Sequence, residues 1–307
     1  MNRKTIKVPI EADSEPRIDK FITEQENLFP RSQIKQRNAR FILNGKEVKA
    51  SKKVKPGDIV QVSWEELPEP EIEPEQVDLD IIYEDDNVLV INKQQGMVVH
   101  PANGNYSGTL AQGLLYYCRS IAESFSTEDM RPGIVHRLDK DTSGVIITAK
   151  NTETLEFLSQ QFRSRKTMKT YYAVTKGIPK PKEGIIKGII GRDRKNRKAF
   201  TWKTSSGKPA KTDYKVLNRF GTYAFVELHP RTGRTHQLRV HMRSVGTPIL
   251  GDPIYARKDA RFKNATLMLH AAKLEISIPG TDEPMVFRAP LPKRFSRFFR
   301  KIKNQPS

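Results

Sequence analysis

The sequence predicts an α+β protein: a main domain built on a mixed, mainly antiparallel sheet, preceded by a small α/β domain. Three observations support this fold class. Short β-branched runs recur with hairpin turns and helical segments between them, and no regular strand-helix-strand repeat indicates a doubly wound parallel sheet. In addition, residues 65–80 (EELPEPEIEPEQVDLD) carry only acidic charges and three prolines within a basic chain. Such a composition favours extended chain and predicts a linker between two domains.

A chain of 307 residues has the length of two average domains. The predicted organisation is an N-terminal extension over residues 1–14, a small domain over 15–64, the acidic Pro-rich linker over 65–78, the main domain over 79–300 and a tail over 301–307.

In the small domain, residues 17–22 begin a short amphipathic helix, and Pro30-Arg31-Ser32 has the composition of a second helix start. Asn44-Gly45 stands between apolar residues and predicts a hairpin turn. Gly57-Asp58 predicts another turn before a strand. These signals indicate two helices followed by short strands.

In the main domain, Asp85-Asp86-Asn87 separates two β-branched runs and predicts a hairpin, and Asn151 is suited to cap a helix. Residues 108–117 (GTLAQGLLYY) have helical apolar spacing. Further elements are predicted as strands over 145–149, 171–174, 213–217 and 223–228, two strands within 267–278 (LMLHAAKLEISI), and a basic amphipathic C-terminal helix in 292–303 (PKRFSRFFRKIK).

The formal net charge is +19, which indicates a polyanionic partner, because clustered Lys and Arg release counterions when they bind phosphates. Nucleic acid is therefore favoured over a membrane surface. No apolar run approaches the roughly 18–20 residues that span a bilayer, and no signal peptide is evident, so a cytoplasmic protein is expected. Cys118 is the one cysteine, and its apolar surroundings predict a buried small hydrophobe rather than a nucleophile.

The usual signatures of cofactors and metals are absent from the sequence. It contains no GxGxxG after a strand, no GxxxxGK[ST], no paired cysteines and no G-x-S-x-G elbow. His236 and His241 are five residues apart, which places them badly for one helical face, and hydrogen bonding is the favoured role for both. We therefore expect neither a cofactor nor a metal ion.

The densest polar segment is residues 131–144 (RPGIVHRLDKDTSG), just before an apolar strand. Asp139 is flanked by Arg137 and Lys140, so it should be ionised at neutral pH and ready to act as a nucleophile or base. Asp141 is two residues away and can point elsewhere. The spacing leaves open the alternative that Asp139 merely ties down the loop through salt bridges.

Two further segments concentrate polar groups. In residues 231–241 (RTGRTHQLRVH), a helix beginning near Thr235 would place Arg239 and Arg243 as i, i+4 neighbours, facing either a catalytic cleft or phosphates. In KTYYAV, adjacent tyrosines Tyr171 and Tyr172 point to opposite faces of a strand. A strand tyrosine either packs in the core or stacks on an extruded base.

Basic residues also recur at near-helical spacing in the small domain, at Arg31, Lys35, Arg37 and Arg40. They form either a solvated charged face or a set of phosphate contacts, and the spacing does not choose between them.

Three motifs together resemble the active-site motifs of the RluA-type pseudouridine synthases. HRLDKDTSG matches the family's H-R-L-D-x-D-T-S-G in full, KTYYA matches K-x-Y-x-A, and TGRTHQLRVH matches T-G-R-x-H-Q-[IL]-R-x-H. Residues 15–64 resemble the alpha-L RNA-binding module of the ribosomal-protein-S-four type, through RIDKF, PRS, NGKEVK and KPGD. The resemblance spans roughly residues 15–290 and implies a pseudouridine synthase fold for the main domain.

The resemblance implies isomerisation of uridine to pseudouridine in RNA without a cofactor. It assigns the catalytic aspartate to Asp139, the tyrosine that stacks on the uracil to Tyr171 and the basic partner of the aspartate to Arg239. It makes Arg137 the arginine that fills the space left by the flipped nucleotide. Arg234 and His236 match motif positions with RNA contact, and Arg31 and Lys35 are the expected RNA contacts of the small domain.

The expected substrate is large-subunit ribosomal RNA, with transfer RNA as the close alternative, and the protein is expected to act as a monomer. A non-catalytic RNA-binding or ribosome-assembly factor is the second class of function, and the presence of Asp139, Tyr171 and Arg239 argues against it. A metal-dependent RNA hydrolase is the third class, and the sequence lacks the clustered ligands that it would need.

Overall fold

The computed structural model divides the chain into two compact units, Met1–Pro70 and Glu71–Ser307. The structure describes residues 2–9, 15–26, 28–29, 31–66, 72–101, 104–125, 131–193, 196 and 198–303. The division between the units falls inside the segment predicted as a linker, and each unit has its own hydrophobic cores.

The N-terminal unit combines a small antiparallel sheet with short helical turns. In its described part the strand order is β1-β4-β2-β3. The elements are β1 (Asn2–Lys7), α1 (Ile18–Lys20), the π-helical turn η1 (Phe21–Gln25), the 3-10 turn η2 (Arg31–Gln33), β2 (Arg40–Leu43), β3 (Lys46–Val48) and β4 (Ile59–Trp64). Ile18, Phe21, Phe41 and Val60 pack in its core, so the helical face covers the sheet.

The structure differs from two expectations for this unit. Residues 2–7 do not lie outside the domain as part of an extension; they pair with β4 along its length, and Ile6 is buried. The second helix predicted at Arg31 is a single 3-10 turn. The hairpin prediction is confirmed: Leu43 pairs with Lys46, and Asn44 and Gly45 take the positive φ values that this tight turn requires.

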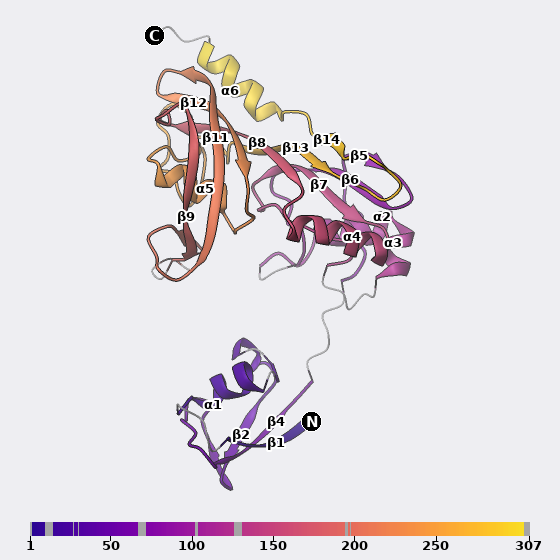
Figure 1. The fold of residues 1–307 in the computed structure, drawn as a ribbon, viewed down its shortest axis with the longest axis vertical. Coiled ribbons are helices and arrows are strands. Elements are labelled where there is room, and N and C mark those ends of the chain that lie inside the picture. The colour runs from indigo at the N-terminus through magenta and orange to yellow at the C-terminus, as the bar shows by residue number, and fades with distance from the viewer. Residues whose placement is uncertain are drawn as a thin grey trace. The chain divides into compact units, whose positions relative to one another are not determined.

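The C-terminal unit is built on a long sheet with mainly antiparallel pairing, which confirms the predicted fold class (Figure 1). Within the described residues its order is β10-β9-β11-β12-β8-β13-β7-β6-β5, and β14 pairs with β13. One join, between β13 and β7, is parallel. The strands are β5 (Ile81–Glu84), β6 (Val88–Lys93), β7 (Ser143–Ala149), β8 (Met168–Lys176), β9 (Glu183–Arg192), β10 (Phe200–Thr201), β11 (Lys208–Phe220), β12 (Tyr223–Pro230), β13 (Leu269–Ile276) and β14 (Met285–Arg288).

Helices cover this sheet at several places. They are α2 (Leu110–Tyr117), α3 (Arg119–Ser124), α4 (Thr152–Arg163), α5 (Gln237–Ser244) and α6 (Lys293–Lys303). Local sequence explains two of the helix starts. Thr109 and Gln112 form a reciprocal capping box on α2, and the Asn151 side chain accepts from the Thr154 backbone N–H on α4, as predicted.

Several helices and strands have bounds in the structure that differ from the predicted ones. Residues 267–278 contain one strand, β13 over Leu269–Ile276, rather than two, because β13 continues through a register shift between Ala271 and Lys273. Strand β9 was not predicted. Helix α5 begins at Gln237, two residues later than expected, because His236 has a left-handed backbone with φ 56°. Helix α6 is confirmed as amphipathic and runs to Lys303, so the first residues of the expected tail are helical.

The two halves of the sheet have separate cores that meet around β8, β13 and β7. Leu228 and Met242 belong to the core beside β8, β11 and β12, whereas Ile147 and Leu158 belong to the core beneath α4. Cys118 is buried in a third core with α2 and α3, which confirms its expected environment. The polar loop before β7 therefore ends where the halves join.

Gly144 makes the closest backbone approach at this join. It has φ 120°, and a Cβ atom built on it would lie 2.1 Å from the carbonyl oxygen of Ala271 on β13. The parallel contact between β7 and β13 brings Gly144 opposite Ala271. A side chain at this position would therefore force the two strands apart, and glycine is required for steric reasons.

Replacing Gly144 with alanine should lower the free energy of unfolding by more than about 2 kcal/mol, because the new methyl group meets backbone that cannot rotate away. Thermal or urea unfolding measures the change. Gly188→Ala is the matched control: it also lies in a strand, and an added Cβ meets nothing within 4 Å. Equal stability of the two variants would contradict the steric explanation.

Candidate active site

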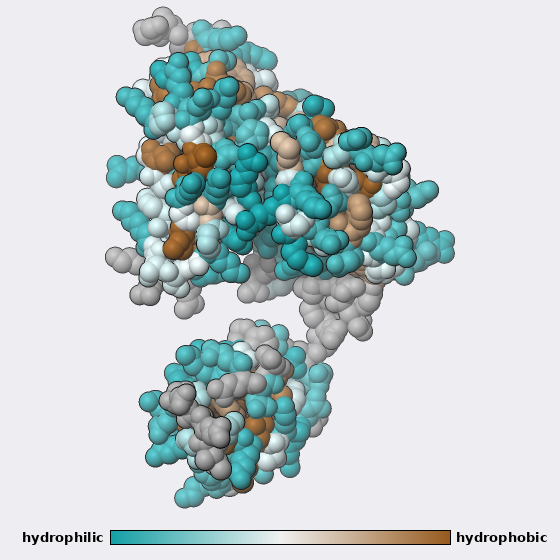
Figure 2. Space-filling view, viewed as in Figure 1, coloured by the Kyte–Doolittle hydropathy of each residue, from teal (hydrophilic) through white to brown (hydrophobic). Residues whose placement is uncertain are grey.

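A cleft of about 1110 Å³ collects the polar motifs of the sequence. Its walls come from the loop before β7, from the end of α4 and the start of β8, and from the segment between β12 and α5. Asp139, Tyr171 and Arg239, which are 32 or more positions apart in the chain, all line it. In Figure 2, hydrophilic side chains cover much of the visible face between the β9–β12 half of the sheet and α4. The predicted residues thus meet at one site.

The Asp139 carboxylate lies against a buried guanidinium group. Arg239 Nη1 donates to Asp139 Oδ2 at 3.1 Å, and His236 Nε2 lies 3.9 Å from the same oxygen. The Asp139 side chain is 21% exposed, whereas that of Arg239 is 3% exposed. The ion pair with Arg239 orients the carboxylate, and the remaining exposure leaves Asp139 accessible from the cleft.

Arg239 is held by a second carboxylate that the sequence analysis missed. Asp252 accepts from Arg239 Nε at 2.7 Å and from Nη2 at 2.9 Å, and its side chain is fully buried. Burial alone would lower the pKa of Arg239, but the hydrogen bonds and charge of Asp252, with those of Asp139, raise it. Arg239 therefore remains a cation in a fixed orientation.

Asp252 is itself fixed by backbone. Its Oδ1 also accepts from the N–H groups of Ile254 and Tyr255, both at 2.9 Å. The guanidinium carbon of Arg239 lies 5.1 Å from the centre of the Tyr255 ring, within the range of a cation–π contact. The turn over residues 252–255 thus orients Arg239 toward Asp139.

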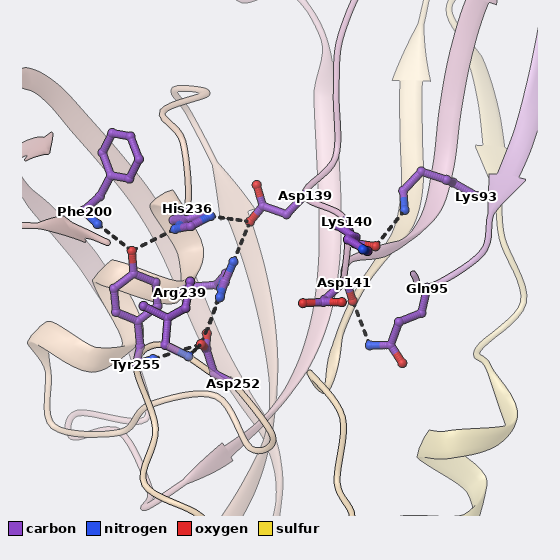
Figure 3. Close-up of polar contacts among 11 residues, drawn as sticks. Lys93, Gln95, Asp139, Lys140, Asp141, Phe200, His236, Arg239, Asp252 and Tyr255 are labelled. Atoms are coloured by element: carbon purple, nitrogen blue, oxygen red, sulfur yellow. Dashed lines mark hydrogen bonds and ion pairs between the residues drawn. The ribbon is translucent and has the colours of Figure 1, made fainter. Parts of the chain in front are cut away.

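A chain of hydrogen bonds determines which nitrogen of His236 carries its proton (Figure 3). The Phe200 N–H donates to Tyr255 Oη at 2.7 Å, and Tyr255 Oη lies 2.8 Å from His236 Nδ1. Since burial lowers the pKa of His236, its ring is neutral at pH 7. We assign Tyr255 as the donor to Nδ1, so Nε2 carries the hydrogen and points toward Asp139.

Tyr171 enters the cleft from β8. It pairs with Leu228 of β12 and Ala271 of β13, at the centre of the sheet. Burial, and then the charge of Asp139, raise the pKa of Tyr171, so its hydroxyl is neutral at any working pH. Tyr172 faces the other way, and its ring lies 5.2 Å from that of Phe225. Opposite orientations of these two tyrosines were predicted.

A buried lysine, Lys93, anchors the loop that carries Asp139 through hydrogen bonds to backbone carbonyls. Lys93 Nζ donates to the carbonyl oxygens of Gln94 (2.9 Å), Met97 (2.8 Å) and Lys140 (3.2 Å). Burial lowers the pKa of Lys93 to about 7. Beside it, Gln95 Nε2 donates to the Asp141 carbonyl at 2.8 Å, so both residues after Asp139 are held through their backbone (Figure 3).

Helix α6 anchors the C-terminal end of the same loop, at Ser143. Arg294 Nη2 of α6 donates to Ser143 Oγ at 2.6 Å, and Ser143 Oγ lies 2.8 Å from His270 Nδ1. Because the serine oxygen already accepts from arginine, its own hydrogen is available for Nδ1. Burial lowers the pKa of His270 to about 4, which keeps the ring neutral as an acceptor. The sequence analysis missed this contact because its partners are 127 and 151 positions apart.

The remaining predicted residues have different surroundings. Arg137 is exposed at the cleft and makes no hydrogen bond or ion pair with another described residue. Arg234 also lines the cleft, and its Nε donates to the Pro209 carbonyl at 3.1 Å. In the N-terminal unit, Arg31 donates to the buried Asp19 at 2.8 Å, and Lys35 is exposed. Three basic residues of the segment 191–203, Arg194, Lys195 and Arg197, lie outside the described residues.

The described part of the chain contains no cluster of histidine, cysteine and carboxylate side chains that could hold a metal ion. His241 instead bonds through Nδ1 to Thr212 Oγ1 at 2.8 Å. Nor does any helix in the described ranges have the length and apolar character to cross a bilayer.

Comparison with known proteins places this cleft in a family. The family model for RNA pseudouridylate synthase matches residues 87–244, which include Asp139, Tyr171 and Arg239. The chain belongs to this family. The ribosomal large subunit pseudouridine synthase D of Borreliella burgdorferi is 45% identical over 92% of this chain and 88% of the relative. An uncharacterized RNA pseudouridine synthase of Bacillus subtilis, YlyB, is 43% identical over 99% of both chains.

Solved structures agree with this family membership. The human RNA pseudouridylate synthase domain containing 4 has a TM-score of 0.57 and 26% identity, over 74% of this chain and 95% of that one. The human RNA pseudouridylate synthase domain containing 1 has a TM-score of 0.56 and 27% identity, over 76% of this chain and 98% of that one. The protein is an RNA pseudouridine synthase, an isomerase, as the sequence resemblance implied.

In this pseudouridine synthase, Asp252→Asn should lower the free energy of unfolding by on the order of 3 kcal/mol, because it leaves the buried Arg239 charge with a neutral partner. Pseudouridine formation should fall more than tenfold, since Arg239 loses its fixed orientation. Urea unfolding and product assays measure the two effects. Glu123→Gln, which breaks an exposed ion pair with Arg119, is the control and should change neither quantity. Wild-type stability in Asp252→Asn would refute the anchoring role.

Proposed function

We propose that this synthase isomerises uridines in large-subunit ribosomal RNA and that Asp139 is its catalytic residue. The observation that carries the proposal is the arrangement of Asp139 in the cleft: a partly exposed carboxylate held at 3.1 Å by a buried guanidinium that Asp252 fixes from behind. A carboxylate that merely tied down its loop would have no need of a rigid, preoriented cation on the cleft side.

The reaction breaks the N1–C1′ glycosidic bond of uridine, turns the uracil and joins C5 to C1′. The hydrogen on C5 is lost and N1 gains one, so the net change is an isomerisation without redox chemistry. An ionised Asp139 serves this reaction either by attacking C1′ or by removing the proton from C2′. Both routes require a correctly oriented carboxylate, and the hydrogen bond from Arg239 orients that of Asp139. The neutral Nε2–H of His236 offers a further donor near the same oxygen.

Extrusion of the target base is the second requirement, because C1′ and C5 are inaccessible in a stacked helix. Flipping a nucleotide costs roughly a few kcal/mol. The Tyr171 ring, which lines the cleft, supplies a surface for the uracil, and a stacked base gains about 1–3 kcal/mol. Arg137, exposed at the cleft and without a hydrogen bond or ion pair to any residue that the structure describes, is suited to occupy the space that the nucleotide leaves.

Ribosomal RNA is the proposed substrate for two reasons. A relative with 45% identity is named for the ribosomal large subunit, and the formal charge of +19 suits a large polyanion. The N-terminal unit, as an alpha-L-type module, would contribute RNA contacts through Lys35 and the exposed part of Arg31, with Arg234 and His236 acting at the cleft. We propose that the synthase works as a monomer.

Asp139→Asn should reduce pseudouridine formation by at least about 10³-fold, because the amide can neither attack C1′ nor take a proton. RNA binding should stay within about twofold, since the charge contacts of the cleft remain. Single-turnover product assays and filter binding measure the two quantities. Glu153→Gln, an exposed carboxylate in the first turn of α4, is the control and should retain full activity. An Asp139→Asn enzyme with wild-type rate would disprove the assignment.

The substrate is tested by mapping pseudouridines in ribosomal and transfer RNA from cells with and without the gene. Carbodiimide-dependent stops of reverse transcription mark each modified site. We expect stops that disappear from large-subunit ribosomal RNA when the gene is deleted and return with the wild-type gene but not with Asp139→Asn. Loss of stops confined to transfer RNA would replace the proposed substrate, and unchanged RNA in both classes would refute the proposal.

A further inference from the structure

A second group of polar side chains lines the catalytic cleft and has hydrogen-bonding capacity that the protein itself does not use. The group consists of His136, in the loop before Asp139, and of Thr167 and Lys169, at the start of β8. It takes no part in the network of Asp139, Arg239 and Asp252. All three residues present donors, and no carboxylate pairs with them within the described residues.

His136 is a neutral donor with a known tautomer. Its Nε2 accepts a hydrogen bond from the backbone N–H of Ile147 at 3.0 Å, so the ring proton is on Nδ1. Burial, and then the nearby charge of Lys169, lower the pKa of His136 to about 3. Among the described residues Nδ1–H has no acceptor, and it is not one of the enclosed polar atoms. Because His136 lines the cleft, we infer that Nδ1–H faces it.

Phe162 holds His136 and Lys169 beside each other. Its ring stacks on the His136 imidazole with centroids 4.6 Å apart, and Lys169 Nζ lies 5.6 Å from the centre of the same ring. The donor of His136 and the cation of Lys169 are therefore fixed on one aromatic side chain from α4.

Lys169 is a partly buried cation without a counter-ion among the described residues. Burial alone accounts for the lowering of its pKa, and no carboxylate opposes that effect. The cation–π contact with Phe162 offsets part of the desolvation. A buried charge without a partner is costly, so the site gains free energy when an anion enters.

Thr167 adds a third unused group. The residue is 9% exposed, and its Oγ1 is enclosed with no hydrogen-bond partner in the part of the chain that the structure describes. Thr167 and Lys169 are two residues apart in extended chain, so their side chains point to the same side. Unsatisfied buried hydroxyls are uncommon in folded proteins, and each calls for an explanation.

We propose that His136, Thr167 and Lys169 form an anion subsite that binds one backbone phosphate of the RNA substrate. This subsite rests on the proposed function for the identity of the anion. His136 provides an N–H and Lys169 a cation, and the enclosed Thr167 hydroxyl joins them by rotating about χ1 toward the cleft that the residue lines. Together they form the donor set that a phosphate oxygen accepts. Phosphate is favoured over a free carboxylate because every nucleotide of the substrate brings one into the cleft.

The place of the subsite indicates which phosphate it binds. Lys169 and Tyr171 lie on the same face of β8, and a two-residue step along a strand is about 6.6 Å. A phosphate on Lys169 therefore lies close to a uracil stacked on Tyr171, and belongs to the target nucleotide or its neighbour. The subsite positions the extruded nucleotide and contributes no group to the chemical step.

Anion binding is tested first without RNA, on the full chain labelled with ¹⁵N-histidine. His136→Gln identifies the His136 signals by their loss. Titration with inorganic phosphate should shift these signals in wild type and in Lys166→Met, and should not shift them in Lys169→Met. Lys166 is the matched control because it is exposed and lies outside the cleft lining. Signals that do not move in wild type, or that move equally in Lys169→Met, would overturn the subsite.

The RNA contact is tested with an oligonucleotide that contains the mapped uridine. Lys169→Met should raise KM about 10-fold, as expected for loss of a charge-assisted hydrogen bond, and leave single-turnover kcat within about twofold. The slope of log K against log salt should fall by about 0.7 for the one phosphate lost from single-stranded RNA. Thr167→Val, nearly equal in size, should raise KM by a smaller factor. A normal KM and salt slope in Lys169→Met would overturn the assignment to RNA.

The two tests separate failure of the subsite from failure of the proposed function. Phosphate-dependent shifts of His136 in a protein that forms no pseudouridine would uphold the anion subsite and refute the function. If the protein forms pseudouridine but the chemical shifts of His136 do not change on addition of phosphate, the function is upheld and the subsite is refuted.

Discussion

The pairing of one buried guanidinium with two carboxylates is the constraint on which the active site depends. Arg239 is almost entirely buried and carries a full positive charge, which would be strongly destabilising without partners. Asp252, held in turn by two backbone N–H groups, accepts from one side of the guanidinium, and the remaining Nη1 is directed at Asp139. The position of the Asp139 carboxylate is thus fixed by the folding of residues 239–255, before any substrate arrives.

The sheet supplies the scaffold for this constraint. Strands β7, β13 and β8 bring together the loop of Asp139 and the side chain of Tyr171, and α5 carries Arg239 over the neighbouring strands. The backbone at His236 is left-handed, which is unfavourable for a residue with a side chain by roughly 1–3 kcal/mol. That conformation directs the imidazole toward Tyr255 and Asp139, so strain is concentrated at the functional site, where the surrounding hydrogen bonds maintain it.

Local signals in the sequence were enough to predict much of the fold. The Asn44-Gly45 turn, the Asn151 cap and the apolar spacing of α2 each depend on residues close in the chain, and all three are confirmed. Strand β9 was not predicted, because Gly184, Gly188 and Gly191 weaken its β-propensity. Its pairing with β11 supplies the stabilisation that the local sequence lacks.

The active site, too, was predictable from the sequence only in part. The family resemblance named Asp139, Tyr171 and Arg239, and the structure brings them into one cleft, although their catalytic roles stay predictions. Residue spacing alone left Asp139 between catalysis and loop support. Asp252 and Lys93 escaped notice because their roles depend on burial and on partners distant in sequence, neither of which one sequence displays. A lysine that ends an otherwise apolar strand, as in VLVINK, is the signal that could have drawn attention to Lys93.

The bond from Arg294 to Ser143 has a consequence for the order in which the protein is made. The ribosome synthesises the loop of Asp139 first, then the strand and helix that bring Tyr171 and Arg239, and α6 after all of these. The donor that fastens Ser143 is 151 positions further along the chain. A nascent chain still lacking α6 has every predicted catalytic side chain but not the clamp at the end of the loop. The enzyme therefore completes its active site only after α6 has been synthesised.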